Sequence, residues 1–227
     1  MAINNTKKSQ EEIFRNLYYK FKGTPMEVSS ESYAHKKTRY DIISQLVEAE
    51  EVIQVHDVGM GLASYYDYLL NRFSDKVIDY SGSDIVLEYV NDVKKKYGNV
   101  KIFNRDLAEG PGNDKYDYLI MSGLFHQRRD SRISDWERFS QAIIKNTYIM
   151  CNKAIAFNFI TPFVDFYQTD VYYCNLPKLL NFINDELSRF FVLHHNYALF
   201  EFTVFVYKEA HIKSLYPEIE FKKYFKR

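Results

Sequence analysis

Two glycines and two acidic residues are spaced as in a nucleotide-type ligand site. Asp57, Gly59 and Gly61 close an apolar run over residues 52–58, and Asp84 follows about 20 residues later. Glycine has no Cβ, so a ligand can approach the bare backbone of such a turn. The helix expected after the turn starts with unpaired N–H groups, and a carboxylate at Asp84 can accept hydrogen bonds from a ribose diol. The spacing therefore predicts half of a nucleotide-type site.

The glycine spacing separates two kinds of nucleotide site. A dinucleotide fingerprint is G-x-G-x-x-G/A, and counting from Gly59 its sixth position falls on Ser64. The small residue lies one place earlier, at Ala63, and an acid precedes the glycines, which gives D-x-G-x-G-x-A. An ordinary strand, turn and helix with two glycines is the alternative explanation.

The composition is that of one globular α/β domain in a reducing compartment. The chain has 227 residues, 46% hydrophobic and 26% charged, with a formal net charge of +0. A broad basic surface for nucleic acid is not expected. The two cysteines form neither a metal spacing nor a disulfide framework, so we expect no metal and a cytoplasmic location. Neither a signal peptide nor a membrane-spanning run is expected, so a membrane is not a predicted partner.

Hydrophobic periodicity predicts strands that alternate with helices. Helices are expected over 10–22 and from about 32 to 51, ahead of the glycine turn. Further helices are expected after the turn, from 86, from 134 to 150 and from 176 to 187. The strands are expected over 52–58, 76–84, 100–103, 116–121, 154–159, 190–193 and 198–207. The first five strands should pair in parallel, and the last two should form an antiparallel hairpin.

These elements predict an α/β fold: a Rossmann-like, doubly wound, seven-stranded sheet with an antiparallel last strand. The two N-terminal helices are an addition to that sheet. They are expected to form a helical lid over residues 1–50, with residues 51–227 as the sheet domain. Packing of these helices on the sheet is the alternative.

The pattern at 57–63 resembles motif I of the class I S-adenosylmethionine-dependent methyltransferases. Residues 80–85 are similar to the family's Y-x-G-x-D-I, residues 116–125 to its segment after strand 4, and residues 197–203 to its closing hairpin. The segments occur in the family's order and spacing, over roughly residues 10–208. The departures are Ala63 for a third glycine, Met60 for a common cysteine, and His126 where asparagine is common.

The resemblance implies S-adenosyl-L-methionine as the cofactor and a small-molecule or sugar-linked acceptor, methylated at oxygen. It is closest in kind to small bacterial methyltransferases of small-molecule and glycan pathways. Two alternatives remain open at this point. One is a nicotinamide-dependent oxidoreductase, against which the glycine spacing and the hairpin argue. The other is an inactive cofactor-binding or interaction protein of the same fold.

Each part of adenosylmethionine has expected partners. The turn around Gly59 and Gly61 should serve the methionine end, with Asp57 holding the turn or reaching the ammonium through water. Asp84 should bind the ribose. The other cofactor-binding residues are expected to be Asp106 and Leu107 after the third strand, Ile85 against the adenine, Ser122 after the fourth strand, and Arg39, which the resemblance places at the carboxylate. Asp84 as a loop acid, Asp106 as a turn cap and Arg39 as part of a basic face are the alternatives.

The acceptor is expected at the end of the fourth strand, where His126 lies. Histidine titrates near neutral pH, so His126 is the candidate catalytic base, with orientation of the acceptor or a plain loop role as alternatives. The substrate-binding candidates come from the aromatic loop 161–175 and from the start of the hairpin: Tyr167, Tyr172, Tyr173 and His195. Core or rim packing is the alternative for each of them.

Overall fold

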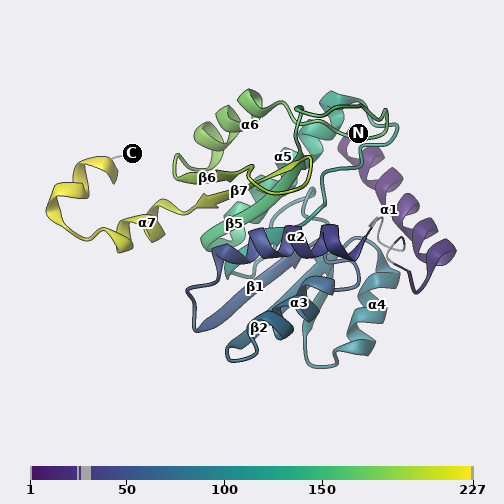
Figure 1. The fold of residues 1–227 in the computed structure, drawn as a ribbon, viewed down its shortest axis with the longest axis horizontal. Coiled ribbons are helices and arrows are strands. Elements are labelled where there is room, and N and C mark those ends of the chain that lie inside the picture. The colour runs from purple at the N-terminus through teal and green to yellow at the C-terminus, as the bar shows by residue number, and fades with distance from the viewer. Residues whose placement is uncertain (1, 25, 27–31, 226–227) are drawn as a thin grey trace.

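Seven strands form one sheet in the computed structural model, which describes residues 2–24, 26 and 32–225 (Figure 1). Their order in the sheet is β3-β2-β1-β4-β5-β7-β6. Strands β1 to β5 pair in parallel, and β7 pairs antiparallel with both β5 and β6. The predicted fold class is confirmed. The strands are β1 (Val52–Val58), β2 (Val77–Asp84), β3 (Lys101–Asn104), β4 (Tyr116–Met121), β5 (Cys151–Ile160), β6 (Phe191–His194) and β7 (Glu201–Tyr207).

Helices cover both faces of this sheet, and each face has its own apolar core. One core joins β4, β5 and β7 to α5 and α6. The other joins β1 and β2 to α2, α3 and α4. The α-helices are α1 (Ala2–Phe21), α2 (Tyr33–Ile43), α3 (Ser64–Arg72), α4 (Leu87–Lys96), α5 (Ile133–Met150), α6 (Leu176–Phe182) and α7 (Glu209–Leu215). Shorter helical turns are η2 (Ser44–Leu46), η3 (Ile183–Leu187) and η4 (Ile219–Phe225).

Several element boundaries differ from the sequence prediction. Helix α1 begins at Ala2, well before residue 10, and α2 ends at Ile43, where the tighter turn η2 takes over. Strand β7 begins at Glu201 because residues 197–200 bend over the end of the sheet. The side chain of Ser32 caps α2 by accepting from the His35 N–H. Pro25, a residue type that breaks helices, and residues 29–31, whose side chains are also suited to capping α2, lie outside the described residues.

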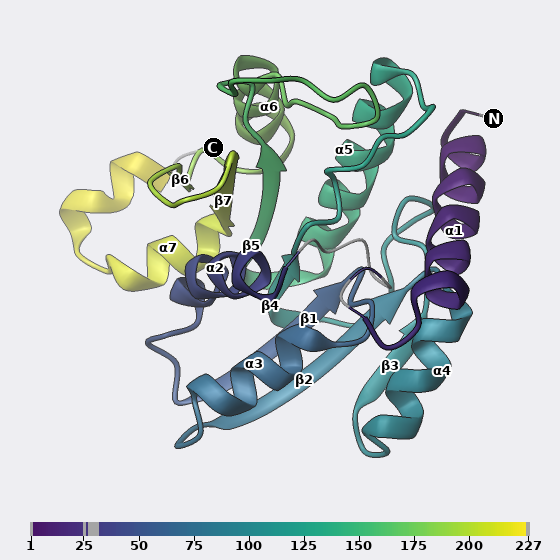
Figure 2. The same ribbon diagram turned by 45° about the vertical axis from the view of Figure 1, so that its right-hand side comes forward.

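Helix α1 lies beside α4 and α5 at one side of the molecule (Figure 2). Polar contacts join it to the sheet domain along its length. Arg15 contacts Glu88, and the Tyr18 hydroxyl donates to Asp92 at 2.7 Å. Nearer its start, Lys7 pairs with Asp106 and Glu109. These contacts place α1 next to the carboxyl ends of β2 and β3.

The strand order reverses between β1 and β4. The chain adds β2 and β3 on one side of β1 and then returns to place β4 on its other side. Ligands of open α/β sheets bind at such a switch point, outside the carboxyl ends of the strands. Within the described ranges, no helix combines the length and apolar content that a bilayer crossing requires.

Candidate active site

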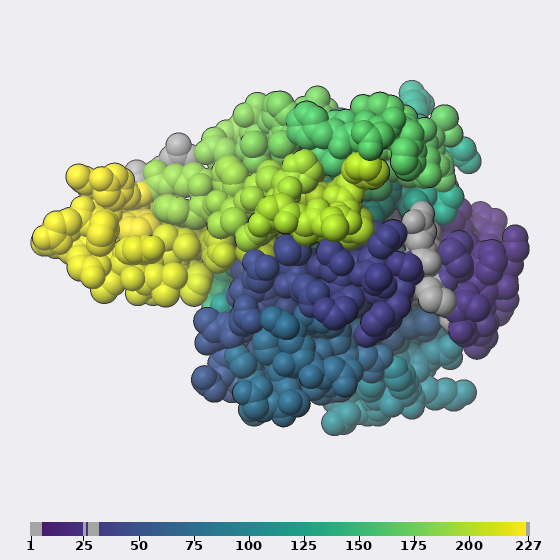
Figure 3. Space-filling view, in the orientation of Figure 1, coloured from purple at the N-terminus to yellow at the C-terminus, as the bar shows by residue number. Residues whose placement is uncertain are grey.

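A cavity of about 710 Å³ opens at the carboxyl ends of the parallel strands. Helices α1 and α2, the loop after β4, the loop after β5 and residues 197–201 line its walls. In the space-filling view, α2 lies directly against the hairpin segment that precedes β7, so the two close one side of the cavity (Figure 3). Its size falls within the range of small-molecule and cofactor sites.

The glycine turn forms the part of the wall that follows β1. Three alternate residues are left-handed, with φ of +71° at Gly59, +54° at Gly61 and +56° at Ala63. The N–H groups of Gly59 and Met60 donate to the Ser83 carbonyl at 2.8 and 3.1 Å, which anchors the turn to β2. A Cβ on Gly59 would lie 2.7 Å from Cδ1 of Leu124. Glycine at 59 therefore avoids both the strain of a positive φ and a displacement of the Leu124 side chain.

Asp84 ends β2 on the cavity wall, as predicted from its position. Its Oδ2 accepts the Gly61 N–H and its Oδ1 accepts the Val86 N–H, both at 2.9 Å. A carboxylate has about four acceptor positions, so two remain for a ligand. Burial raises the pKa of Asp84 to about 6. The turn and the acid are thus fixed to each other before any ligand binds.

Asp57 lies beneath the turn rather than on the cavity wall. It is 3% exposed and accepts a hydrogen bond from the Tyr80 hydroxyl at 2.9 Å. Burial raises its pKa to about 7. This placement agrees with the first of its two expected roles, holding the turn. Contact with a ligand ammonium is disfavoured, because the Asp57 carboxylate is bonded to Tyr80 and Asp57 is not among the residues that line the cavity.

The ends of β2 and β3 supply an apolar slot with one acidic group. Ile85 and Leu107 line it, and Phe14 of α1, which packs on the same apolar cluster as Ile85, also lines the cavity. Oδ1 of Asp106 accepts the Ala108 N–H at 2.8 Å, so this acid does cap a turn. Its Oδ2 lies 3.2 Å from the Lys7 ammonium but is buried without an aligned hydrogen bond. That oxygen is free to accept an exocyclic amine.

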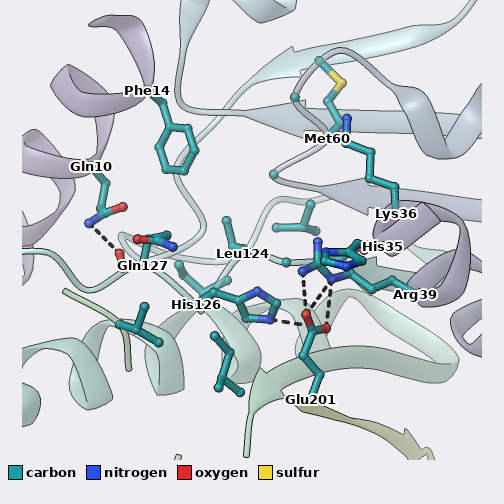
Figure 4. Close-up of a pocket in the computed structure, with 18 of the residues that line it drawn as sticks. Gln10, Phe14, His35, Lys36, Arg39, Met60, Leu124, His126, Gln127 and Glu201 are labelled. Carbon is teal, nitrogen blue, oxygen red and sulfur yellow. Dashed lines mark hydrogen bonds and ion pairs between the residues drawn. The ribbon is translucent and has the colours of Figure 1, made fainter. Parts of the chain in front are cut away.

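Arg39 lines the cavity, where it is paired with Glu201 and is not a free cation. Its Nε lies 2.9 Å from both oxygens of Glu201, and its Nη2 lies 2.5 Å from Oε1 (Figure 4). Burial works against the charge of Arg39, but the Glu201 carboxylate outweighs it and raises the pKa of Arg39. Nη1 bonds to none of the described residues, and a Cβ on Gly123 would lie 3.6 Å from it. This nitrogen remains for a ligand.

Asn158 connects Glu201 to His126. Its Oδ1 accepts the Gly123 N–H at 2.7 Å, and its Nδ2 lies 2.6 Å from Oε2 of Glu201 and 3.1 Å from Nε2 of His126. Burial lowers the pKa of His126 to about 4, with the Arg39 charge acting in the same direction. His126 is therefore a neutral imidazole on the cavity wall at neutral pH, and a weak base.

The four substrate-binding candidates differ in whether they line the cavity. A short backbone pairing between the loop after β4 and the loop after β5 decides this for two of them. Gln127 bridges to Val171, and the Tyr172 N–H donates to the His126 carbonyl at 2.9 Å. Side chains alternate along such an extended segment, so Val171 and Tyr173 line the cavity while Tyr172 enters the core. There the Tyr172 hydroxyl bonds to Glu137 at 3.1 Å. Tyr167, 69% exposed, and His195, also exposed, lie outside the cavity, so three of the four candidates are not on its wall.

Comparison with known proteins agrees with this geometry. No family model matches the chain. It is 27% identical over 169 residues to the Mycobacterium tuberculosis protein "Putative methyltransferase Rv1506c", covering 73% of this chain and 99% of that protein. The prediction of a class I S-adenosylmethionine-dependent methyltransferase is confirmed.

Two solved methyltransferase structures share the fold. Magnesium protoporphyrin IX methyltransferase from Synechocystis, with bound adenosylmethionine, superimposes with a TM-score of 0.62 at 16% identity, over 89% of this chain and 97% of that one. The 1,6-didemethyltoxoflavin-N1-methyltransferase of Burkholderia thailandensis gives 0.58 at 13% identity, over 88% and 87%. The two proteins are named for different acceptors, so the shared fold does not identify the acceptor of this methyltransferase.

Sequence reasoning missed two polar residues of the methyltransferase site, Asn158 and Glu201. Both lie at the carboxyl-terminal region of the sheet, one in β5 and one at the start of β7, and both are buried. A signal was present, because each is a polar residue flanked on both sides by phenylalanine. A buried polar side chain needs partners, so such a position indicates a network or a site.

Proposed function

We propose that this methyltransferase transfers the methyl group of S-adenosylmethionine to an oxygen of a small-molecule or sugar-linked acceptor. The observation that supports this best is the joint placement of the left-handed glycine turn and Asp84 on one cavity wall. The cofactor would lie over β1 to β3, with its ribose at Asp84 and its adenine between Ile85, Leu107 and Asp106. Nη1 of Arg39 and the turn backbone would hold the methionine end, and Ser122 would border the methyl group.

The layout of the cavity supports catalysis by alignment of the acceptor with the methyl group. Methyl transfer is an in-line displacement at a carbon that the sulfonium already activates, so the protein mainly aligns the acceptor. The cofactor half of the cavity lies over β1 to β3, and the other half lies over β4, β5 and β7, beside His126. An acceptor bound there would face the methyl group across the switch point.

Titration calorimetry with adenosylmethionine, adenosylhomocysteine and NAD, read beside a turnover assay, tests the proposal. We expect binding of the first two and not of NAD. Preferential binding of NAD would favour the oxidoreductase alternative. Binding of adenosylhomocysteine without turnover on any acceptor would favour an inactive binding protein.

We propose a cytoplasmic location and an acceptor other than nucleic acid, on the basis of composition and burial. Cys151 and Cys174 are free and buried, which suits a reducing cytoplasm. The net charge of +0 gives no support to a nucleic-acid acceptor.

We also propose that the N-terminal helices cover the cofactor as a lid. Phe14 and Gln10 of α1 line the cavity, and the Gln10 side chain donates to the Gln127 carbonyl at 3.1 Å (Figure 4). Phe14→Ala is expected to weaken adenosylhomocysteine binding about tenfold, since removing a phenyl ring from an apolar contact costs roughly 1.5–3 kcal/mol. Calorimetry measures this. Tyr19→Ala on the exposed side of α1 is the matched control, and equal affinities of the two variants would contradict the lid.

His126 is expected to orient the acceptor rather than remove its proton. His126→Asn should lower turnover by much less than a hundredfold and raise the KM of the acceptor, because a group with a pKa near 4 contributes little as a base at neutral pH. Steady-state kinetics with an acceptor found in the turnover assay measure both constants. A general base typically contributes roughly 10²–10⁴-fold. A loss of that size with cofactor affinity intact would restore the catalytic-base hypothesis.

A further inference from the structure

The half of the cavity over β4, β5 and β7 has mainly apolar walls. Side chains from the end of β5, the loop after it and the segment before β7 form them: Ile160, Val164, Phe166, Val171, Tyr173 and Phe200. Ring contacts join these segments, since Phe166 packs edge-on against Phe200 at 6.0 Å and Tyr173 against Tyr167 at 4.7 Å. Such walls favour a flat, largely apolar ligand over a polar one.

One polar group on this half has its hydrogen-bonding role fixed by its neighbours. A backbone N–H can only donate, so the 2.7 Å contact with Gly123 identifies the Asn158 oxygen. The Asn158 amide nitrogen must then face Glu201 and His126, and it donates to both. Nε2 of His126 is therefore a hydrogen-bond acceptor. A proton on Nε2 would set two donors against each other at 3.1 Å, and Glu201 is 3.8 Å away, too far to accept it.

The proton of the neutral imidazole consequently resides on Nδ1. This nitrogen bonds to none of the described residues, yet it is not sealed off from the cavity. Figure 4 shows the ring with one nitrogen toward Glu201 and the other toward the cavity. His126 thus presents an N–H donor to the acceptor, and this nitrogen cannot take up the acceptor's proton.

The two charged side chains that act on His126 cancel each other. Arg39 and Glu201 form an ion pair, and His126 is neutral because burial lowers its pKa. The positive charge at the reacting centre would be the sulfonium of the cofactor itself. That charge and an N–H donor together favour an acceptor oxygen that has already lost its proton.

On the basis of the proposed function, we propose that the acceptor is a flat, largely apolar molecule with a conjugated acidic hydroxyl, of the phenol or enol type. Its oxygen accepts a hydrogen bond from Nδ1–H of His126, and Asn158 is the positioning residue that fixes this tautomer. The hydroxyl proton passes to solvent before transfer. An oxygen lone pair then becomes the new bond to the methyl carbon as the carbon–sulfur bond breaks. The two electrons of the carbon–sulfur bond stay on sulfur, so the sulfonium becomes the uncharged thioether of adenosylhomocysteine.

A sugar hydroxyl fits this half of the cavity poorly. It holds its proton at neutral pH, so it needs a base, and the tautomer of His126 removes the nearest one. The remaining hydroxyls of a sugar ring would also face phenylalanine, isoleucine and valine side chains without partners, which carries a desolvation cost. Of the two acceptor types in the proposed function, the small molecule is therefore favoured.

The tautomer is measured by long-range ¹H–¹⁵N correlation spectra of histidine, which need neither cofactor nor acceptor. We expect a neutral histidine protonated at Nδ1 at pH 7 whose signals vanish in His126→Asn, while those of buried His56, whose Nδ1 lies 2.8 Å from the Ser81 hydroxyl, remain. In Asn158→Ala this tautomer should lose its majority, while Asn152→Ala, at an exposed position of the same strand, should leave it unchanged. An Nε2–H signal assigned to His126 in the wild type, or titration of His126 near pH 6.5, overturns the proposal even if Asn158→Ala does not fold.

The acceptor class is measured by calorimetry on the complex with adenosylhomocysteine, with 4-nitrophenol and methyl β-glucoside as probes. We expect 4-nitrophenolate to bind at least about tenfold more tightly than the glucoside, and His126→Leu to remove most of that preference. His126→Asn, whose amide nitrogen reaches the position of Nδ1, should keep more of that preference than His126→Leu does. Equal or tighter binding of the glucoside overturns the acceptor class. Failure of adenosylhomocysteine itself to bind would instead count against the proposed function.

Discussion

Replacing Asp84 by alanine is expected to weaken adenosylmethionine binding at least about tenfold. The carboxylate would lose its hydrogen bonds to the ribose hydroxyls, and bonds to a charged group are worth roughly 1.5–3 kcal/mol each. The substitution would also leave the N–H groups of Gly61 and Val86 without their acceptor. Through these two bonds Asp84 connects the glycine turn to the start of α4. Titration calorimetry with adenosylhomocysteine measures the change, with thermal unfolding as a check on folding. Unchanged affinity in folded protein would exclude Asp84 as the ribose ligand.

The same carboxylate predicts a pH dependence of cofactor affinity. Burial raises the pKa of Asp84 to about 6, so the free protein holds the protonated form below that pH. A diol donates to the ionised form, so affinity should rise as pH increases through 6 and level off above it. In Asp84→Asn this slope should disappear. Asp57→Asn is the control, because Asp57 also titrates near neutrality but contacts Tyr80 instead of the cavity, and it should keep the slope.

Breaking the Arg39–Glu201 pair is expected to destabilise the fold by about 3 kcal/mol or more. The Glu201 side chain is 6% exposed, so Arg39→Met leaves a buried carboxylate without its cation, a change that typically costs roughly 3–5 kcal/mol. Denaturant unfolding at pH 7 measures the free energy of unfolding. The double variant Arg39→Met/Glu201→Leu should recover much of the loss, because it removes both charges from the interior.

An exposed ion pair provides the matched control for this prediction. Lys145 and Glu186 lie 2.5 Å apart but are about half exposed, so Lys145→Met should cost less than about 1 kcal/mol. Without Arg39 the pKa of Glu201 should rise above its unfolded value, so the Arg39→Met protein should regain stability as pH falls toward 5. Equal losses in Arg39→Met and Lys145→Met, or no recovery at lower pH, would contradict the buried-pair interpretation.

The part of the cavity wall at the ends of β1 to β3 could be predicted because its signals are local in the sequence. Two glycines directly after a strand permit a turn with positive φ, and an acid at the end of the next strand lies beside that turn once the strands pair in parallel. Asp84, Ile85 and Asp106 reach the cavity for the same reason, since each directly follows or ends a strand. The strand pattern likewise predicted the hairpin of β6 and β7.

The sequence by itself thus determined the helices and strands, the pairing of the strands and the residues at the ends of β1 to β3. Only the tertiary structure decided which side chains contact one another in the half of the cavity over β4, β5 and β7. Arg39 meets Glu201 because β7 inserts between β5 and β6 and brings its first residue under α2. Asn158 reaches both His126 and Glu201 because β5 lies between β4 and β7. A side chain's protonation and partners depend on burial and on neighbours far along the chain. The pattern of residues around His126 could therefore not indicate that it is neutral, bonded at Nε2, and a hydrogen-bond donor to the cavity.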